Sequence, residues 1–319
     1  MALPVRIACM GELLVEFVCT RRNGHHRVPA SYTGPFPSGA PGIFIDQAAR
    51  IGGNAIFIGA VGNDAFGQVL LDRLSGVGVA PDLISVARGI PTGTAFVSYN
   101  DDGSRDFVYN IALSAASHFS ADTTTLAKLA DFGLDVMHVS GSALADPDMA
   151  TKILHTCRTL HSQGVAISFD PNIRKELMGN ASYLDVVRTL MGICRYFLPS
   201  EEDAVVLFPG ESMATFGQSL LASGVEAVVL KRGERGTAGL TRLGDPVDLA
   251  GHKVEVVDPT GAGDCFCATF VTLMASGTYS FQAALQRANA AGALSVGKIG
   301  PMEGNSTLAE IETFLAVRS

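Results

Sequence analysis

The sequence is poor in charged residues and has no concentrated run of basic ones. Only 17% of its 319 residues are charged, and 31 acidic side chains outnumber 23 basic ones, which gives a formal net charge of -8. Neutralising the phosphates of a nucleic acid requires a dense lysine and arginine surface. The composition therefore argues against a nucleic-acid partner and favours a small-molecule one.

Cysteines are few and show neither a CxxC spacing nor a paired framework; they are Cys9, Cys19, Cys157, Cys194, Cys265 and Cys267. This spacing indicates neither a zinc site nor a disulfide scaffold, and it fits the reducing cytoplasm. Cys265 and Cys267 are expected to be small core residues of a helix.

Long apolar runs are also missing, so no segment is expected to span a membrane. The apolar N-terminal stretch VRIACMGELLVEF contains Glu12 and Glu16, and no cleavage-like segment follows it. We therefore predict a strand there rather than a signal peptide. A cytoplasmic protein without a membrane partner is expected.

The common nucleotide-binding motifs do not occur where they would matter. No GxxxxGKS or GxxxxGKT follows a predicted strand, and the first strand leads into GELLVEF rather than into GxGxxG. The sequence therefore supports neither a P-loop nor a dinucleotide-binding fingerprint. Any phosphate is expected to bind at residues 260–264.

Short apolar runs alternate with helical stretches along the chain. AIFIGAVG, VMHVSG, AISFDPN and AVVLKRG read as strands, and GIFIDQAARIG and MATKILHTCRTLHSQG read as helices. Strands that are apolar throughout, separated by single helices, are typical of a parallel sheet covered on both faces. We predict one α/β domain over residues 1–319, with a doubly wound, mainly parallel central sheet flanked by helices.

Two stretches, about 13–38 and 91–113, break this alternation of strands and helices. They alternate polar and apolar residues and contain turn signals such as DDGS. We expect antiparallel strands outside the main sheet, which form either a small β lid over a site or an ordinary surface hairpin. The exposed edges of such strands also suggest pairing with the lid of a second copy, in a homodimer.

The stretch DPTGAGDCF, residues 258–266, carries the candidate chemistry. It follows HKVEVV, which is predicted to be a strand, and it precedes a predicted buried helix. A helix that begins at the end of a strand offers unpaired N–H groups, and Gly261, Ala262 and Gly263 let a phosphate approach the main chain. Asp264 is a candidate general base that accepts a hydroxyl proton as this oxygen attacks a terminal phosphoryl group. The alternative is that Asp264 only caps the helix.

Two stretches resemble the signatures of the ribokinase-like (PfkB) carbohydrate kinases: GGNAIFIGAVGNDAFGQVLLDRLSGVGV at residues 52–79 and DPTGAGDCFCATF at 258–270. The resemblance covers nearly the whole chain. It implies a ribokinase-like fold, a small β lid over the sugar, and transfer of the γ-phosphoryl group of ATP, with Mg²⁺, to a hydroxymethyl oxygen. It also implies that Asp258 and Thr260 help hold a monovalent cation such as K⁺.

The resemblance extends to segments beside the nucleotide. LKRGERG resembles the strand and turn near the phosphates or ribose, which concerns Lys231, Gly233 and Gly236. RANAAGALSV resembles the segment that borders the adenine, with Asn289 at the contacting position. A helix-capping or interhelical hydrogen bond is the alternative for Asn289.

The metal and the sugar pocket depart from the family pattern. Relatives usually carry Asn-x-x-Glu near the metal, whereas PSEED offers Ser200 and Asp203, so Asp203 is expected to handle Mg²⁺ through water. Ile43 stands where an Asn commonly meets sugar hydroxyls. The resemblance otherwise implies a sugar pocket made by seven residues: Glu16, Gly39, Arg105, Asn110, Asp170, Asn172 and Arg174. For Arg174 a structural ion pair is the alternative.

We therefore expect an ATP-dependent sugar kinase that acts on a primary hydroxyl of a neutral ketohexose, of the tagatose or fructose type. VYNIALSAAS places Ile111 where the resemblance to 2-keto-3-deoxygluconate kinases would require an Arg to meet the substrate's carboxylate. The alternatives are such a keto-deoxy-acid kinase and a non-catalytic sugar-sensing relative. A nicotinamide dehydrogenase is disfavoured by the missing GxGxxG.

Overall fold

The computed structural model describes residues 3, 5–102, 104–173 and 180–318. Within these residues a nine-stranded sheet forms the centre, in the order β13-β12-β11-β10-β9-β8-β1-β4-β5. All neighbours from β11 to β5 are parallel, and β12 and β13 add an antiparallel edge. The strands are β1 (Arg6–Met10), β4 (Asn54–Gly62), β5 (Ile84–Ala87), β8 (Val136–Ser140), β9 (Ala166–Asp170), β10 (Tyr196–Phe197), β11 (Ala227–Lys231), β12 (Thr237–Thr241) and β13 (Val247–Leu249).

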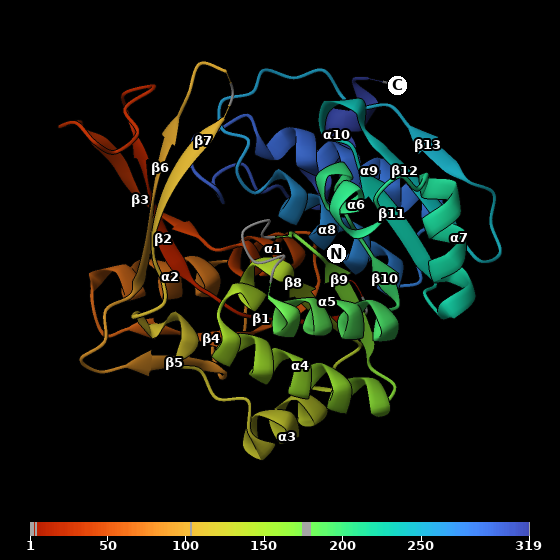
Figure 1. Cartoon of the computed structure of the whole chain (residues 1–319), viewed down its shortest axis with the longest axis horizontal. Coiled ribbons are helices and arrows are strands. Elements are labelled where there is room, and N and C mark those ends of the chain that lie inside the picture. Colours follow the sequence, from red (N-terminus) through yellow and green to blue (C-terminus); the bar gives the residue numbers. More distant parts are fainter. Residues whose placement is uncertain (1–2, 4, 103, 174–179, 319) are drawn as a thin grey trace.

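Helices cover both faces of this sheet (Figure 1), as its wholly apolar strands require. One face packs against α1 (Ala40–Arg50), α2 (Ala65–Gly76), α8 (Ala262–Ala275), α9 (Phe281–Ser295) and α10 (Leu308–Ala316). The other packs against α3 (Thr123–Phe132), α4 (Pro147–Ser162), α5 (Ala181–Ile193), α6 (Glu201–Leu207) and α7 (Met213–Ser223). Three short 3₁₀ turns complete the elements: η1 (Ala115–Ser117), η2 (Gly141–Ala145) and η4 (Gly233–Arg235). The predicted doubly wound α/β architecture is confirmed.

The two stretches that break the strand and helix alternation form a separate four-stranded sheet, called the lid sheet here, in the order β3-β2-β6-β7. Its strands are β2 (Leu14–Cys19), β3 (Tyr32–Ser38), β6 (Gly93–Tyr99) and β7 (Arg105–Asn110). It stands out beside the main sheet, at the upper left of Figure 1. The expected antiparallel pairing is found between β2 and β3 and between β6 and β7, which are two separate pairs. The two pairs join along β2 and β6, and these two strands are parallel.

The predicted strand at HKVEVV does not form. Residues 251–256 adopt no regular structure, and Val256 and Val257 are 59% and 50% exposed. The backbone N–H groups of Val257 and Asp258 both donate to the Val296 carbonyl, so this segment is anchored by a loop and not by a neighbouring strand. β13, which precedes this segment, is the last strand of the sheet.

The buried helix predicted after the GAG turn does form as α8, with Cys265 and Cys267 fully buried in it. All six cysteines are unpaired by disulfides and buried. None of the helices in the described part of the chain is long and apolar enough to cross a membrane.

Candidate active site

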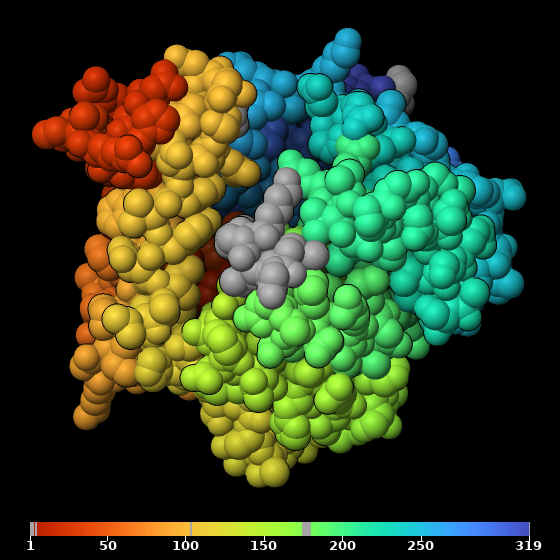
Figure 2. All heavy atoms as spheres, in the orientation of Figure 1, coloured from red at the N-terminus to blue at the C-terminus, as the bar shows by residue number. Residues whose placement is uncertain are grey.

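A cavity of about 820 Å³ lies between the carboxyl ends of the main-sheet strands and the lid sheet. Figure 2 shows the molecule hollowed here, between the lid sheet in red to yellow and the later part of the chain in green to blue. The cavity lies where β1 and β8 are neighbours and the strand order runs away from them on both sides, the place where open α/β sheets bind ligands. Five polar residues that end or follow the main strands line it: Glu12, Ser142, Asp170, Ser200 and Lys231.

The GAG turn forms one wall of this cavity, and its two glycines differ in backbone conformation and in the space around them. Gly261 is the N-cap of α8 with φ +85°, and a Cβ there would lie 2.6 Å from the Pro301 carbonyl oxygen. Gly263 is already helical, and an added Cβ would meet only the Lys231 ammonium, at 3.6 Å. The first N–H groups of α8 and a lysine therefore face one small space, which is the arrangement that binds a phosphate.

Asp264 lies in the first turn of α8 and lines the same cavity. Its carboxylate is thus held within a few residues of the amides that face the phosphate space. A general base must reach both the attacking hydroxyl and the phosphoryl group, and this role of Asp264 stays a prediction.

Lys231, at the end of β11, is anchored by Asp170 at the end of β9. Its ammonium forms a close ion pair with Asp170 Oδ2, and the Cys267 thiol lies 3.4 Å from both partners. Burial opposes the charge on Lys231 most strongly, but the nearby acidic groups, Asp170 first and then Cys267 and Asp203, together outweigh burial and raise the pKa of the ammonium, which stays charged. The resemblance implied a sugar-pocket role for Asp170, which stays a prediction; this carboxylate lines the cavity and is paired with Lys231.

Two carboxylates lie at the opposite, lid-side end of the cavity. Glu16 on β2 is 3% exposed, and burial, followed by the nearby Asp258, raises its pKa to about 7. Its Oε2 accepts a weak hydrogen bond from Ser38 at 3.4 Å, and its Oε1 has no hydrogen-bond partner among the described residues. Glu12 is also buried and accepts a hydrogen bond from Ser142 at 2.7 Å. A buried oxygen such as Oε1 is expected to receive a donor from a ligand.

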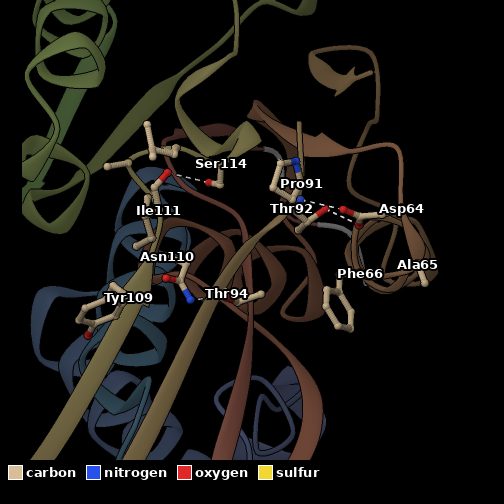
Figure 3. Close-up of a pocket in the computed structure, with 12 residues that line it drawn as sticks. Asp64, Ala65, Phe66, Pro91, Thr92, Thr94, Tyr109, Asn110, Ile111 and Ser114 are labelled. Atoms are coloured by element: carbon tan, nitrogen blue, oxygen red, sulfur yellow. Dashed lines mark hydrogen bonds between the residues drawn. The ribbon is translucent and has the colours of Figure 1, made fainter. Parts of the chain in front are cut away.

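Side-chain alternation in the lid sheet decides which of its residues reach the cavity. Arg105, Phe107 and Tyr109 on β7 line it together with Glu16. Asn110 was expected there, but it lies on the other face of β7, where its amide donates to Thr94 Oγ1 at 3.2 Å (Figure 3). The expectation was wrong because the register that pairs Thr94 with Asn110 turns both side chains away from the sugar side.

Asp203, expected to handle Mg²⁺, is engaged in local structure. Its Oδ2 accepts hydrogen bonds from the amide and hydroxyl of Ser200, which forms a capping box at the start of α6. Its Oδ1 accepts the Ile173 amide at 2.7 Å. Asp203 lines the cavity while both of its oxygens accept hydrogen bonds from the chain, and its contact with Mg²⁺ through water stays a prediction.

Asp258 and Thr260, expected to hold a monovalent cation, are likewise bonded within the protein. Asp258 is 1% exposed, and it accepts the Thr260 and Gly300 amides at 2.9 Å each as well as the Tyr99 hydroxyl. The described residues supply three hydrogen-bond donors to this carboxylate, and the cation site at Asp258 and Thr260 stays a prediction.

The remaining predicted residues divide between the cavity wall and its surroundings. Gly233, Gly39 and Asn172 line the cavity. Gly236 and Asn289 do not: Gly236 packs against the Leu249 carbonyl, and the Asn289 amide donates to the Ala250 carbonyl at 2.8 Å. Both therefore hold the loop after β13, and the hydrogen bond of Asn289 joins a helix to a loop. Arg174 lies outside the described residues.

Sequence reasoning missed Glu12, Ser142 and Tyr99. Glu12 follows the first strand directly, and polar residues after strands β1 and β8 meet at the same edge of the sheet. A carboxylate in that position was therefore a usable signal. Tyr99 carried none, because its contact with Asp258 joins residues 159 apart in the sequence.

Comparison with known proteins gives the same family over nearly the whole chain. Residues 6–308 match the model of the pfkB family carbohydrate kinases. The chain is 27% identical to a fructokinase of Vibrio alginolyticus, over 88% of this chain and 91% of that protein. It is 29% identical to a 2-dehydro-3-deoxygluconokinase of Bacillus subtilis (strain 168), over 97% and 94%.

Among solved structures, one described as a ribokinase II from E. coli, in complex with ATP and Mg²⁺, superposes with a TM-score of 0.91. The two chains are 37% identical, and the match covers 98% of this chain and 99% of that one. The family model, the fold and the position of the GAG turn on the cavity wall agree, and the chain belongs to the pfkB family of carbohydrate kinases.

Proposed function

We propose that this protein transfers the γ-phosphoryl group of ATP to a primary hydroxyl of a neutral ketohexose of the tagatose or fructose type. The observation that carries the proposal is the position of Asp264, directly after the GAG turn and on the wall of a cavity whose far end is lined by Glu16. The phosphate space and the sugar space are thus two ends of one cavity, with a carboxylate between them.

In the proposed reaction Asp264 accepts the proton of the sugar hydroxyl as that oxygen attacks the γ-phosphorus. The new bond joins the sugar oxygen to phosphorus, the bond from phosphorus to the β–γ bridging oxygen breaks, and ADP leaves. The amides at the start of α8 and the Lys231 ammonium stabilise the negative charge on the transferring group. The lid sheet excludes water that would otherwise accept the phosphoryl group.

Mg²⁺ is proposed to enter with ATP and not to occupy a prebuilt protein site. No cluster of three or more His, Cys, Asp or Glu suited to a metal occurs in the described ranges. Mg²⁺ is usually bound by substrate phosphates, waters and one or two carboxylates. Glu202, and Asp203 through water, line the cavity and suit that limited role. The E. coli structure with ATP and Mg²⁺ supports this donor.

The charge of the cavity supports a neutral acceptor sugar. Of the described lining residues two are basic, Arg105 and Lys231, and seven are acidic: Glu12, Glu16, Asp146, Asp170, Glu202, Asp203 and Asp264. Lys231 is paired with Asp170, and Arg105 donates to Thr260 at 3.3 Å. Ile111, which also lines the cavity, offers no charge to a carboxylate. Among the described lining residues a sugar acid would therefore meet mostly carboxylates, and both cations already have partners.

A coupled ADP-release assay across substrates tests the proposal. The panel contains tagatose, fructose, 2-keto-3-deoxygluconate and a nucleoside at equal concentrations. We expect a neutral ketohexose to exceed the keto-deoxy acid by at least about tenfold in kcat/KM, the factor equal to ~1.4 kcal/mol. A panel led by the keto-deoxy acid would transfer the proposal to the activity of the Bacillus relative. ADP release from none of the compounds would favour a non-catalytic sugar-sensing protein.

A further inference from the structure

One end of the lid sheet is bonded to the loop that leads into the GAG turn. Tyr99 on β6 and Arg105 on β7 are directly opposite each other in the lid sheet, and both reach this loop. The Tyr99 hydroxyl donates to Asp258 Oδ1 and lies 3.1 Å from Thr260 Oγ1. Arg105 donates to the same Thr260 oxygen at 3.3 Å.

The acceptor of this hydrogen bond is the Asp258 carboxylate, a buried group that needs hydrogen-bond donors. Asp258 is almost fully buried, and the other two donors to its carboxylate are backbone amides of the 258–260 and 300 loops. A hydrogen bond to a buried charged acceptor is stronger than one between neutral groups. Opening the lid sheet from this loop therefore leaves Asp258 with one donor fewer.

The same carboxylate is near the sugar end of the cavity. Asp258 is the largest charged influence on Glu16, and Arg105 opposes it, so the three groups share one electrostatic environment. Asp258 also lies three residues before Gly261. The Tyr99 contact thus joins the strand that covers the sugar to the segment that positions the anion hole.

We propose that Tyr99 is a positioning residue that latches the lid sheet to the anion-hole loop through Asp258. This inference rests on the proposed function in one respect, since the latch is useful only if the lid sheet covers the acceptor sugar. When Tyr99 is bonded to Asp258, the lid sheet encloses the sugar and excludes water while the GAG turn is held in position. Tyr99 touches neither the sugar nor the phosphate, so its loss should weaken enclosure and leave the chemical step largely unchanged.

The test compares Tyr99→Phe with the matched control Tyr32→Phe. Tyr32 is another tyrosine of the lid sheet, on β3, whose hydroxyl bonds His26 at 3.0 Å and does not contact the 258–260 loop. Hydrogen–deuterium exchange of residues 93–110 measures the latch without requiring turnover. We expect at least about threefold faster exchange in Tyr99→Phe, and unchanged exchange in that segment for Tyr32→Phe.

Kinetics supply the second readout. For Tyr99→Phe we expect the KM for the sugar to rise at least about fivefold with kcat within roughly threefold, and the ratio of sugar-independent to sugar-dependent ADP release to increase. Unchanged exchange or an unchanged sugar KM would overturn the latch, and so would equal effects of the two variants. If no sugar raises ADP release by the wild type above its rate without sugar, the kinase proposal fails, while the exchange comparison still decides whether Tyr99 holds the lid sheet.

Discussion

Replacing Gly263 with alanine should impair ATP use while leaving the fold intact. Replacing Gly261 with alanine should mainly destabilise the fold and affect ATP use less. The two glycines are separated by one residue, but their backbones differ. Gly263 is inside α8, where alanine is favoured over glycine by about 0.5–1 kcal/mol. Its new Cβ would lie 3.6 Å from the Lys231 ammonium, an ordinary contact distance, so the empty protein accommodates it.

The same Cβ would occupy the space between the first turn of α8 and Lys231, which is the proposed position of the transferring phosphate. Displacing the phosphoryl oxygens from the amides removes a preorganised donor, and the loss of one such donor typically costs ~10² to 10³ in rate. We therefore expect kcat/KM for ATP to fall about 10²-fold in Gly263→Ala, with an unchanged or slightly raised Tm. This expectation differs from that for a glycine with positive φ, because no left-handed conformation is required at residue 263.

Gly261→Ala places a side chain at φ +85° and 2.6 Å from the Pro301 carbonyl oxygen. The left-handed conformation alone costs about 1–2 kcal/mol, and the overlap adds to it. We expect Tm to fall by about 4 °C or more. Calorimetry and coupled ADP release on both variants separate the two effects. Wild-type ATP kinetics in a stably folded Gly263→Ala would refute the placement of the phosphate.

Three further changes test other parts of the site. Asp264→Ala should lower kcat by ~10² to 10⁴ while ATP binding, measured by calorimetric titration, is retained; more than about half of the wild-type kcat would remove its role as base. Lys231→Met should destabilise the fold by about 3–5 kcal/mol because it leaves Asp170 buried and unpaired, and adding Asp170→Leu should restore stability to denaturant without restoring activity. Glu16 has a folded pKa of about 7, above its unfolded value, so its contribution to stability is present at low pH and is lost as the pH rises from about 5 through 7. The free energy of unfolding of Glu16→Gln should therefore lack that decline. Parallel pH profiles of the free energy of unfolding for the two proteins would contradict the raised pKa.

The architecture could be predicted because its determinants are local. β8 and β9 are buried at every position, and each is followed by an amphipathic or buried helix, so apolar runs and helical spacing identified them without knowledge of their partners. The start of α8 was predictable for the same reason, since Gly261 and the apolar residues after Asp264 mark a helix N-terminus in sequence. The HKVEVV segment shows the limit of this reasoning. Its alternating valines suit a strand, but a strand also needs a pairing partner, and the backbone of Val257 bonds the Val296 carbonyl instead.

The orientation and partners of the site residues could not be predicted, because they depend on pairing. Nothing in VYNIAL shows that Tyr109 faces the cavity and Asn110 faces away; the register of β7 on β6 decides it, and a shift of one residue would exchange the two. Asp170 is a similar case. Its position at the end of β9 was predictable, but the ion pair to Lys231 depends on β9 and β11 being one strand apart, with β10 between them.

Asp258 combines both kinds of information. Its place before the GAG turn is a sequence feature, and the resemblance to relatives suggests a cation there. The structure adds the donors: the amide of Thr260 in the same loop, the amide of Gly300, 42 residues after Asp258, and a hydroxyl from the lid sheet, 159 residues before it. A carboxylate that accepts hydrogen bonds from three separate segments fixes those segments relative to one another. Asp258, three residues before Gly261, is therefore also the proposed link between the lid sheet and the GAG turn. The exchange rate of β6 and β7 in Tyr99→Phe measures that link directly.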